Sequence, residues 1–297
     1  MSGWELTPFN QYFYPPKPRK GFRKLEYYSQ FFDCVEVNAT FYNTAFTQEH
    51  VRRWLLDVSA NKNFVFTVKL FQGFTHTFTA SKEDLLSVHR MLAPLVAEEK
   101  LGGLVMQFPY SFSYIPQRLT YLHQLSKAFQ QYRLFVELRH NTWNSPGIFN
   151  SLQEHKLHLI NVDLPRIKEH IPFLSTAWEG AAYFRMMGRN AKTWNNPRRL
   201  EKNGKHIIND RYNYLYRERE LERLLAQIEN IRNFADSVYV VFHNDPEANS
   251  LVNGFQLRHR IRHNQRVLVP ENFVKTYPML KPISSQVNIH HPFFAEA

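Results

Sequence analysis

The stretch from Asp33 to Tyr42 reads DCVEVNATFY and combines an apolar run with two polar residues. Val35 and Val37 alternate with Glu36 and Asn38, which is the spacing of a short strand. Because alternate side chains of a strand point to opposite faces, the two valines face one way, and the carboxylate and the amide face the other. The stretch therefore predicts a core strand that delivers polar groups to one side at its carboxyl end.

Six further apolar runs follow this one, and helical patterns separate them. The expected strands are residues 33–38, 64–70, 103–108, 133–138, 157–163, 181–187 and 238–242. Helix signals lie between them: Ser81 with Asp84 is a capping box, Ser145 with Pro146 opens a helix, and Leu and Ile recur at helical spacing over residues 221–231. Alternation of strands and helices predicts a parallel sheet.

The strand count favours a barrel. With Gly3 and Trp4 as the remnant of a truncated first strand it reaches eight, which is the number in an α/β fold of the TIM (β/α)8 barrel type. An open doubly wound sheet is the alternative, but no glycine-rich phosphate loop follows any early strand.

The same alternation, applied to every expected strand, separates an apolar set from a set that turns polar near the carboxyl ends. The polar set is Glu36, Asn38, Lys69, Gln107, Glu137, Arg139, Asn161, Asp163, Arg185 and His243. In a barrel these side chains converge on one mouth, which is where TIM barrels keep their active sites. Ion pairs such as Glu36 with Lys69, or Glu137 with Arg185, are the alternative; so many costly buried polar groups at one end favour a ligand site.

Composition limits the class of protein. The chain has 297 residues, of which 43% are hydrophobic, enough for one large domain or two modest ones. No run of about 18 apolar residues and no secretion signal appear, so we expect a cytoplasmic protein without a membrane partner. The single cysteine, Cys34, excludes a framework of internal disulfides.

The net charge of +11 indicates an acidic partner. Residues 10–24 contain five Lys or Arg and no acid, and residues 189–211 contain seven against two acids. A phosphate-bearing substrate or a nucleic acid would suit both stretches, and an ordinary solvated basic surface is the alternative.

Several motifs together resemble the YecE-like family, the domain of unknown function 72. They are VEVNATFY (35–42), FVFTVKLFQGFTH (64–76), LGGLVMQFPYSF (101–112), VELRHNTW (136–143), YFRMMGRNAKTW (183–194), YNY (212–214) and VYVVFHNDP (238–246). The resemblance implies a TIM barrel similar to the xylose-isomerase-like and endonuclease IV barrels, with no established activity; a hydrolase or a lyase would fit those barrels. It covers the chain to about residue 263. We therefore expect one barrel domain over 1–263 and a carboxyl-terminal extension over 264–297.

The polar mouth suggests roles for its members. Glu36, Glu137 and Asp163 are the acid–base candidates, because carboxylates in such mouths transfer protons. Lys69, Arg139, His140, Arg185 and Arg189 would hold an anion, since guanidinium groups match phosphate oxygens. The remaining substrate-binding candidates are Asn38, His76, Gln107, Trp143, Trp194, Tyr212, His243 and Asn244.

We therefore predict an enzyme that acts on a phosphate-bearing or other anionic substrate, with a nucleic acid or nucleotide as a candidate. Trp194 and Tyr212 lie among cations, a mixture suited to stacking bases beside a phosphate backbone. A non-catalytic nucleic-acid-binding module is one alternative. The other is an isomerase-like enzyme that acts on a small polyhydroxy substrate. In that enzyme Asn38, Gln107 and Asn244 would form hydrogen bonds with the hydroxyl groups of the substrate.

No cofactor is predicted, and no metal is assigned. The three carboxylates, with His76, His140 and His243, leave a divalent metal open as an alternative. No tight ligand spacing such as HExxH supports it, and neighbouring Arg and Lys would repel a cation.

Overall fold

Each of the seven expected strands is present in the computed structural model, which describes residues 1–195, 198–200 and 207–285. Their bounds are β1 Cys34–Val37, β2 Val65–Lys69, β3 Leu101–Gln107, β4 Leu134–Glu137, β5 Leu157–Leu159 with β6 Asn161–Asp163, β7 Gly180–Met186 and β10 Ala235–Phe242. They form one sheet in the order β1-β2-β3-β4-β5 and a second in the order β10-β7-β6, and every pairing in both is parallel. The fold is mixed α/β with parallel sheets.

The run from Leu157 to Asp163 connects the two sheets. Its first half pairs with β4 and its second half with β7, and only Ile160 lies between them. The Ile160 N–H still donates to Val136 O at 2.8 Å, so the backbone passes from one sheet to the other almost without interruption.

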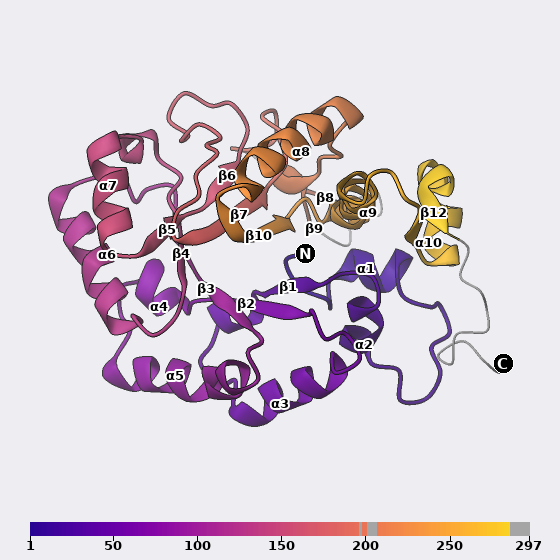
Figure 1. Cartoon of the computed structure of the whole chain (residues 1–297), viewed down its shortest axis with the longest axis horizontal. Coiled ribbons are helices and arrows are strands. Elements are labelled where there is room, and N and C mark those ends of the chain that lie inside the picture. The colour runs from indigo at the N-terminus through magenta and orange to yellow at the C-terminus, as the bar shows by residue number, and fades with distance from the viewer. Residues whose placement is uncertain (196–197, 201–206, 286–297) are drawn as a thin grey trace.

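The amino terminus lies between β1 and β10, which are the strands farthest from the junction at Leu157–Asp163 (Figure 1). Gly3 and Trp4, the expected remnant of a first strand, form no strand. Met1 O accepts a hydrogen bond from Glu36 N–H at 2.9 Å, and the Ser2 hydroxyl donates to the Asp245 carboxylate beyond β10. Where the sequence predicted a first strand, the structure thus has one backbone hydrogen bond, from Glu36 to Met1, and one side-chain hydrogen bond, from Ser2 to Asp245.

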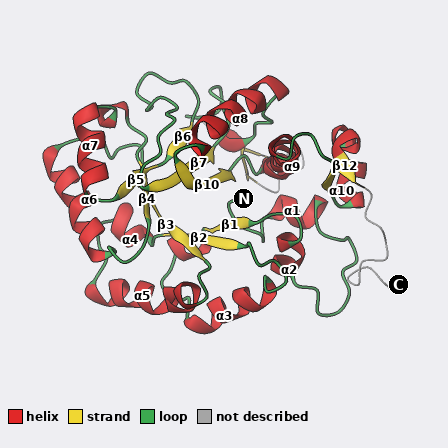
Figure 2. Ribbon diagram, in the orientation of Figure 1, coloured by secondary structure: helices red, strands yellow, loops and turns green. Residues whose placement is uncertain are grey.

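Helices surround the strands (Figures 1 and 2). The α-helices are α1 Thr7–Tyr12, α2 Lys24–Ser29, α3 Gln48–Asp57, α4 Gln72–Thr75, α5 Lys82–Ala97, α6 Pro116–Ala128, α7 Pro146–Glu154, α8 Glu218–Arg232, α9 Asn249–Ile261 and α10 Glu271–Thr276. The 3₁₀ turns are η1 Ala39–Phe41, η2 Asn141–Trp143, η3 Asp210–Tyr212, η4 Pro246–Ala248 and η5 Pro278–Ile283. The predicted helix signals are confirmed: Ser81 and Asp84 form a capping box at the start of α5, Pro146 begins α7, and the stripe of α8 is buried.

Residues 164–179 depart from the expected alternation, because they connect β6 to β7 without a helix. The segment contains Pro165 and Pro172, each of which removes a backbone donor. Asn161 holds it against the sheet: its amide donates to Thr176 O at 2.9 Å and accepts from Thr176 N–H at 2.7 Å.

Two short pairs of strands complete the described fold. β8 Arg198–Leu200 and β9 Ile207–Asn209 are antiparallel, and β11 Val267–Leu268 pairs in parallel with β12 Ser284–Ser285. No helix in the described ranges has the length and apolar character needed to cross a bilayer.

The described part of the predicted extension, residues 264–285, packs on the amino-terminal helices. The Asn272 amide lies 3.0 to 3.2 Å from three consecutive backbone carbonyl oxygens, those of residues 12–14. Phe273 is fully buried, with its ring centroid 5.9 Å from that of Phe13 and 5.8 Å from that of Phe255. This segment therefore shares an aromatic core with α1 and α9.

Candidate functional site

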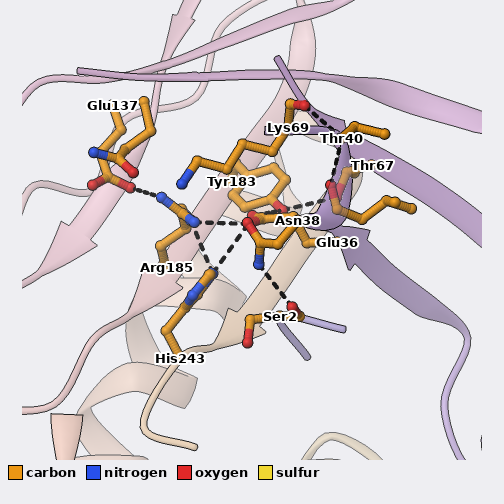
Figure 3. A network of polar contacts seen from close by, with 12 residues as sticks. Ser2, Glu36, Asn38, Thr40, Thr67, Lys69, Glu137, Tyr183, Arg185 and His243 are labelled. Atoms are coloured by element: carbon orange, nitrogen blue, oxygen red, sulfur yellow. Dashed lines mark hydrogen bonds and ion pairs between the residues drawn. The ribbon is translucent and has the colours of Figure 1, made fainter. Parts of the chain in front are cut away.

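Arg185 lies at the centre of the polar mouth and joins two buried carboxylates (Figure 3). It comes from β7, whereas Glu36 comes from β1 and Glu137 from β4. Its Nη2 donates to Glu36 Oε1 at 2.7 Å, and its Nη1 donates to Glu137 Oε2. All three side chains are almost completely buried, so the sequence prediction that they converge agrees with their positions.

The two carboxylates are held ionised. Burial alone would raise the pKa of Glu36, but the Arg185 guanidinium holds it well below its usual range. Burial likewise opposes the shift at Glu137, yet Arg139 and Arg185 lower its pKa to about 2. The cation that pairs with Glu36 comes from the other sheet, because Arg185 lies on β7. A carboxylate that is already ionised and paired is an anchor for a cation rather than a ready proton donor.

Two further side chains complete the shell around Glu36 and Arg185. The Tyr183 hydroxyl donates to Glu36 Oε2 at 2.8 Å and lies 2.9 Å from Thr67 Oγ1. His243 Nε2 accepts from Arg185 Nε at 3.1 Å, which requires a lone pair on that nitrogen. Burial, and then Arg185, lowers the pKa of His243, so its ring is neutral.

Lys69 differs from its neighbours because its amine has no polar partner. It ends β2, and its backbone carbonyl accepts a hydrogen bond from Thr40 Oγ1 at 2.7 Å. Its Nζ lies 3.9 Å from the centroid of the Phe41 ring, and no hydrogen bond or ion pair joins it to any residue that the structure describes. In Figure 3 the amine points toward Arg185, and no dashed line reaches it.

The electrostatic surroundings of Lys69 favour the uncharged amine. Burial, followed by Arg185, lowers its pKa to about 7; Glu36 and Glu137 oppose this shift, and Arg139 adds to it. An amine with this pKa is largely uncharged at slightly alkaline pH.

Arg139 and His76 lie beside Lys69. Arg139 Nε donates to Glu137 Oε1 at 2.5 Å, whereas neither of its Nη atoms has a hydrogen-bond partner in the described part of the chain. His76 packs against the Phe41 ring. Its ring centroid is 4.8 Å from that of Phe41, and the same Phe41 ring contacts the Lys69 amine. Burial, followed by Lys69 and Arg139, lowers the pKa of His76 to about 4. Gln107 lies next to it, with Nε2 3.5 Å from His76 Nε2.

Asp163 and Arg189 form a second polar cluster, at the carboxyl ends of β6 and β7. Arg189 Nε lies 3.0 and 2.8 Å from the two oxygens of Asp163, and its Nη1 donates to Glu220 Oε1 at 2.9 Å. The Tyr216 hydroxyl donates to Asp163 Oδ2 at 2.6 Å. Like Glu36 and Glu137, Asp163 is therefore an ion-paired carboxylate.

A cavity of about 570 Å³ opens beside this second cluster. Residues 163–168 and 170–173 line it together with Glu220, Arg223, Leu224 and Gln227 of α8, and Asp163 and Arg189 form part of its wall. Its charged and titratable lining residues are Asp163, Arg166, Lys168, His170, Arg189, Glu220 and Arg223. Arg and Lys outnumber Asp and Glu in this lining, so the cavity suits an anion.

Three other predicted residues are structural in their contacts. Trp143 is completely buried, donates Nε1–H to Phe112 O at 2.6 Å and therefore belongs to the core. Trp194 is 7% exposed and packs beneath Arg211, whose guanidinium carbon lies 5.4 Å from the centre of the Trp194 rings, so it offers little face to a stacking base. Asn244 is buried and donates to Tyr214 O at 2.7 Å.

The remaining predicted residues lie at the rim of the mouth or near it. The Asn38 amide donates to Ser2 O at 2.7 Å, and the Gln107 amide donates to Phe108 O at 3.1 Å. His140 Nδ1 lies 2.9 Å from Thr142 Oγ1 at the start of η2. The Tyr212 ring packs at a right angle to that of Trp194, with centroids 5.7 Å apart. The amides that were expected to read substrate hydroxyl groups thus already have backbone partners.

The carboxylates do not form a metal site in the described part of the chain. No group of three or more His, Cys, Asp or Glu side chains there could hold a metal ion. His243 Nε2 lies 3.3 Å from Glu36 Oε1, but Arg185 occupies the same oxygen. Guanidinium groups take the carboxylate oxygens that a metal would need.

The two cationic stretches are only partly described. In residues 10–24, Lys17, Arg19 and Lys20 are exposed, whereas Arg23 pairs with Glu26 at 2.9 Å and with Asp57 at 2.8 Å. In residues 189–211, Lys202 and Lys205 lie outside the described residues, as do the side chains of Arg198 and Arg199.

Four site residues were missing from the sequence prediction: Tyr183, Thr67, Tyr216 and Glu220. Tyr183 and Thr67 could have been found, because each lies two residues before a predicted member of the polar set, Arg185 or Lys69, and so faces the same side of its strand. Glu220 and Tyr216 lie in or just before α8, and no local pattern indicates that they reach back to Arg189 and Asp163.

Comparisons with known proteins cover most of the chain. A family model described as "Protein of unknown function DUF72" matches residues 1–276. The UPF0759 protein YunF of Bacillus subtilis (strain 168) is 28% identical over 257 residues, which is 82% of this chain and 88% of that protein.

Two crystal structures are similar to this fold. A DUF72 family protein from Thermotoga maritima MSB8 is 26% identical with a TM-score of 0.73, and the match covers 88% of this chain and 97% of that one. A DUF72 family protein from Enterococcus faecalis V583 is 25% identical with a TM-score of 0.69, and the match covers 80% and 93% of the two chains.

Proposed function

The chain belongs to the DUF72 family, a family of unknown function, and from the geometry of its site we propose that it is an enzyme acting on a small anionic substrate. The substrate would bind where the carboxyl ends of the parallel strands meet, around Lys69 and Arg139. A carboxylate or a phosphate group would provide its charge.

A closed TIM barrel is part of the proposal. The run from Leu157 to Asp163 carries the backbone from one sheet into the other, and Met1 bonds to Glu36 on the opposite side. These two links support a ring of strands in which residues 1–4 replace the first strand. A cytoplasmic location is also proposed, supported by the single cysteine.

One observation carries the proposed function: the mouth holds lysine and arginine donors that no carboxylate among the described residues occupies. Arg185 donates to Glu36, Glu137 and His243, and Arg189 pairs with Asp163 and Glu220. The Lys69 amine and both Nη atoms of Arg139, in contrast, have no hydrogen-bond partner among the described residues. Both residues are partly exposed, so a ligand can reach these donors, and Lys and Arg donors match the oxygens of carboxylates and phosphates. An anion would satisfy both donors.

The three paired carboxylates keep a role in this proposal. Glu36 and Glu137 orient Arg185, Glu137 also orients Arg139, and Asp163 orients Arg189 at the wall of the cavity. Held in this way, the guanidinium groups are arranged before a substrate arrives, which reduces the entropy lost on binding.

The test is a binding screen of small carboxylates and phosphate esters at low ionic strength, read by calorimetry and thermal shift. We expect a bound compound to lose at least about tenfold in affinity, or about 1.4 kcal/mol, in Lys69→Met and in Arg139→Met. Lys20→Met, which removes an exposed cation, is the matched control and should bind normally. If no compound binds, or if all three variants bind equally, the proposal is abandoned.

Nucleic-acid binding is the second candidate, with or without chemistry. The net charge of +11 and the excess of Arg and Lys at the cavity favour it. It predicts binding that falls steeply with salt and that weakens in an Arg166→Ala, Lys168→Ala, Arg223→Ala triple variant. If single-stranded and duplex nucleic acids both fail to bind at low salt, this candidate is excluded.

A further inference from the structure

We propose that Lys69 is a covalent catalyst that forms an imine with the carbonyl carbon of an aldehyde or ketone substrate, and that this substrate also carries a carboxylate or phosphate group. The inference rests on the proposed function, because the anionic group is what Arg139 would hold. It goes further by naming the reacting atom of the protein and the reacting group of the substrate.

Geometry supports this role for Lys69. The side chain stands at the carboxyl end of β2, at the mouth into which β1, β4 and β7 also deliver side chains (Figure 3). The bond from Thr40 Oγ1 to its backbone oxygen and the contact of Phe41 with the amine fix both ends of the residue. No hydrogen bond or ion pair to any described residue would have to break before Nζ could react.

The charges around Lys69 suit a nucleophilic amine. Glu36 faces it from β1, Glu137 and Arg139 from β4 and the residues after it, Arg185 from β7, and His76 from the end of α4. The glutamates are paired with the two arginines, so neither is free to hold an ammonium group. A desolvated lysine next to other cations is one of the ways in which proteins activate an amine for attack on a carbonyl. The lowered pKa of about 7 agrees with this arrangement.

The reaction balances without an additional reactant. The Nζ lone pair forms a bond to the carbonyl carbon, the C=O π bond breaks, and a proton moves from nitrogen to oxygen to give a carbinolamine. That hydroxyl group takes one more proton from solvent and leaves as water, while nitrogen forms the C=N bond. The product is a protonated imine, whose positive charge can accept electrons from the adjacent carbon atoms.

His76 is a neutral neighbour of Lys69 rather than a further cation. A tautomer with hydrogen on Nδ1 satisfies both of its contacts: Nδ1–H donates to Thr75 Oγ1 at 2.9 Å, and Nε2 accepts from the Gln107 amide at 3.5 Å. The ring is neutral at physiological pH, because burial and then Lys69 lower its pKa to about 4. Both ring nitrogens already have partners, so the protons of these steps are exchanged with solvent.

The test is reductive trapping on the full-length protein. Cyanoborohydride reduces an imine to a stable amine, and peptide mass spectrometry locates the added mass. The probes are pyruvate, which carries a carboxylate, dihydroxyacetone phosphate, which carries a phosphate, and dihydroxyacetone, which carries neither. Lys82, the exposed first residue of α5, serves as the internal reference in the same sample.

We expect adducts on Lys69 to form at least about tenfold faster with one anionic probe than with the neutral one, which corresponds to about 1.4 kcal/mol. Lys82 should show neither that speed nor that preference. Trapping on Lys69 should rise with a midpoint near pH 7, whereas an ordinary lysine titrates near about 10.4. Lys69→Arg should remove the adduct and leave labelling of Lys82 unchanged.

The wild-type protein alone can overturn the inference. If Lys69 is trapped no faster than Lys82 while the binding screen finds an anion at the mouth, the covalent role fails and the proposed function stands. If Lys69 is trapped rapidly but equally by all three probes, the amine is a nucleophile and the anionic substrate is wrong.

Discussion

Arg185 is the residue on which the paired charges of the mouth depend. It is 1% exposed, and it holds two carboxylates that are completely buried. Replacing it with Met would leave Glu36 without a guanidinium and Glu137 with only Arg139. Because removing one partner of a buried ion pair leaves an uncompensated charge, we expect Arg185→Met to lower the free energy of unfolding by about 3–5 kcal/mol.

Urea denaturation measures this effect. The matched control is Arg90→Met, which breaks an exposed pair with Glu83 and should change the free energy of unfolding by less than about 1 kcal/mol. Equal effects in the two variants would mean that Arg185 does not compensate buried charge.

Glu137 makes a separate prediction for pH. Its folded pKa is about 2, lower than the ordinary value of 4.5, so the folded protein binds its proton less readily than the unfolded chain does. Its contribution to stability is therefore present above the ordinary pKa and is lost as the pH falls through about 2; it amounts to about 3 kcal/mol. We expect the free energy of unfolding to decrease less between about pH 5 and pH 2 in Glu137→Gln than in the wild type. Parallel pH profiles would contradict the assigned pairing.

At this scale the sequence predicted which residues meet but not how they pair. Alternation along the strands correctly placed Glu36, Glu137 and Arg185 on one side. Long side chains can reach several neighbours, and the choice among them depends on side-chain conformations that no local pattern specifies. The unpaired state of Lys69 follows only once Arg185 has taken both glutamates.

The turn after β7 is the element that positions the second cluster. Gly188 has a φ of +88°, and a Cβ built on it would lie 2.8 Å from Tyr214 Cβ. The Gly188 N–H donates a hydrogen bond to the Tyr216 hydroxyl at 2.8 Å. Alanine there is strained and displaces Tyr214, so we expect Gly188→Ala to cost about 1–3 kcal/mol in thermal or urea unfolding. Gly147→Ala in α7, where a Cβ meets nothing within 4 Å, should be neutral or stabilising by up to about 1 kcal/mol. Similar losses in both variants would show that the conformation of Gly188 is unimportant.

Strong periodic patterns predicted the elements well, and weak ones did not. The seven strands and the helices with caps or apolar stripes follow from local preferences that agree with the final packing. The segment 164–179 was expected to contain a helix, but prolines and tertiary bonds to Asn161 prevail there. Gly3 and Trp4 are too few to form a strand, and the β8–β9 hairpin lies in a polar stretch without alternation.

The two ends of the described chain meet in one aromatic core, a property of the whole molecule. Phe273 packs between Phe13 and Phe255 although its segment was expected to be an extension. If the segment folds with the rest, Phe273→Ala should lower the free energy of unfolding of the whole protein by about 3–5 kcal/mol. Met279→Ala, at an exposed position, should change it by less than about 0.5 kcal/mol. A Phe273→Ala protein that unfolds like the wild type would instead indicate an independent extension.

At the scale of the molecule, the central claim concerns one amine. Lys69 has no hydrogen-bond or ion-pair partner among the described residues and loses its charge near pH 7, and we propose that it meets an anionic substrate. Competitive labelling of lysine amines, followed residue by residue with mass spectrometry across pH, tests this claim most directly. We predict half-maximal labelling of Lys69 near pH 7 and protection of Lys69, but not of Lys82, by a bound carboxylate or phosphate ester. A midpoint near the ordinary lysine value of 10.5, without protection by any anion, would contradict it.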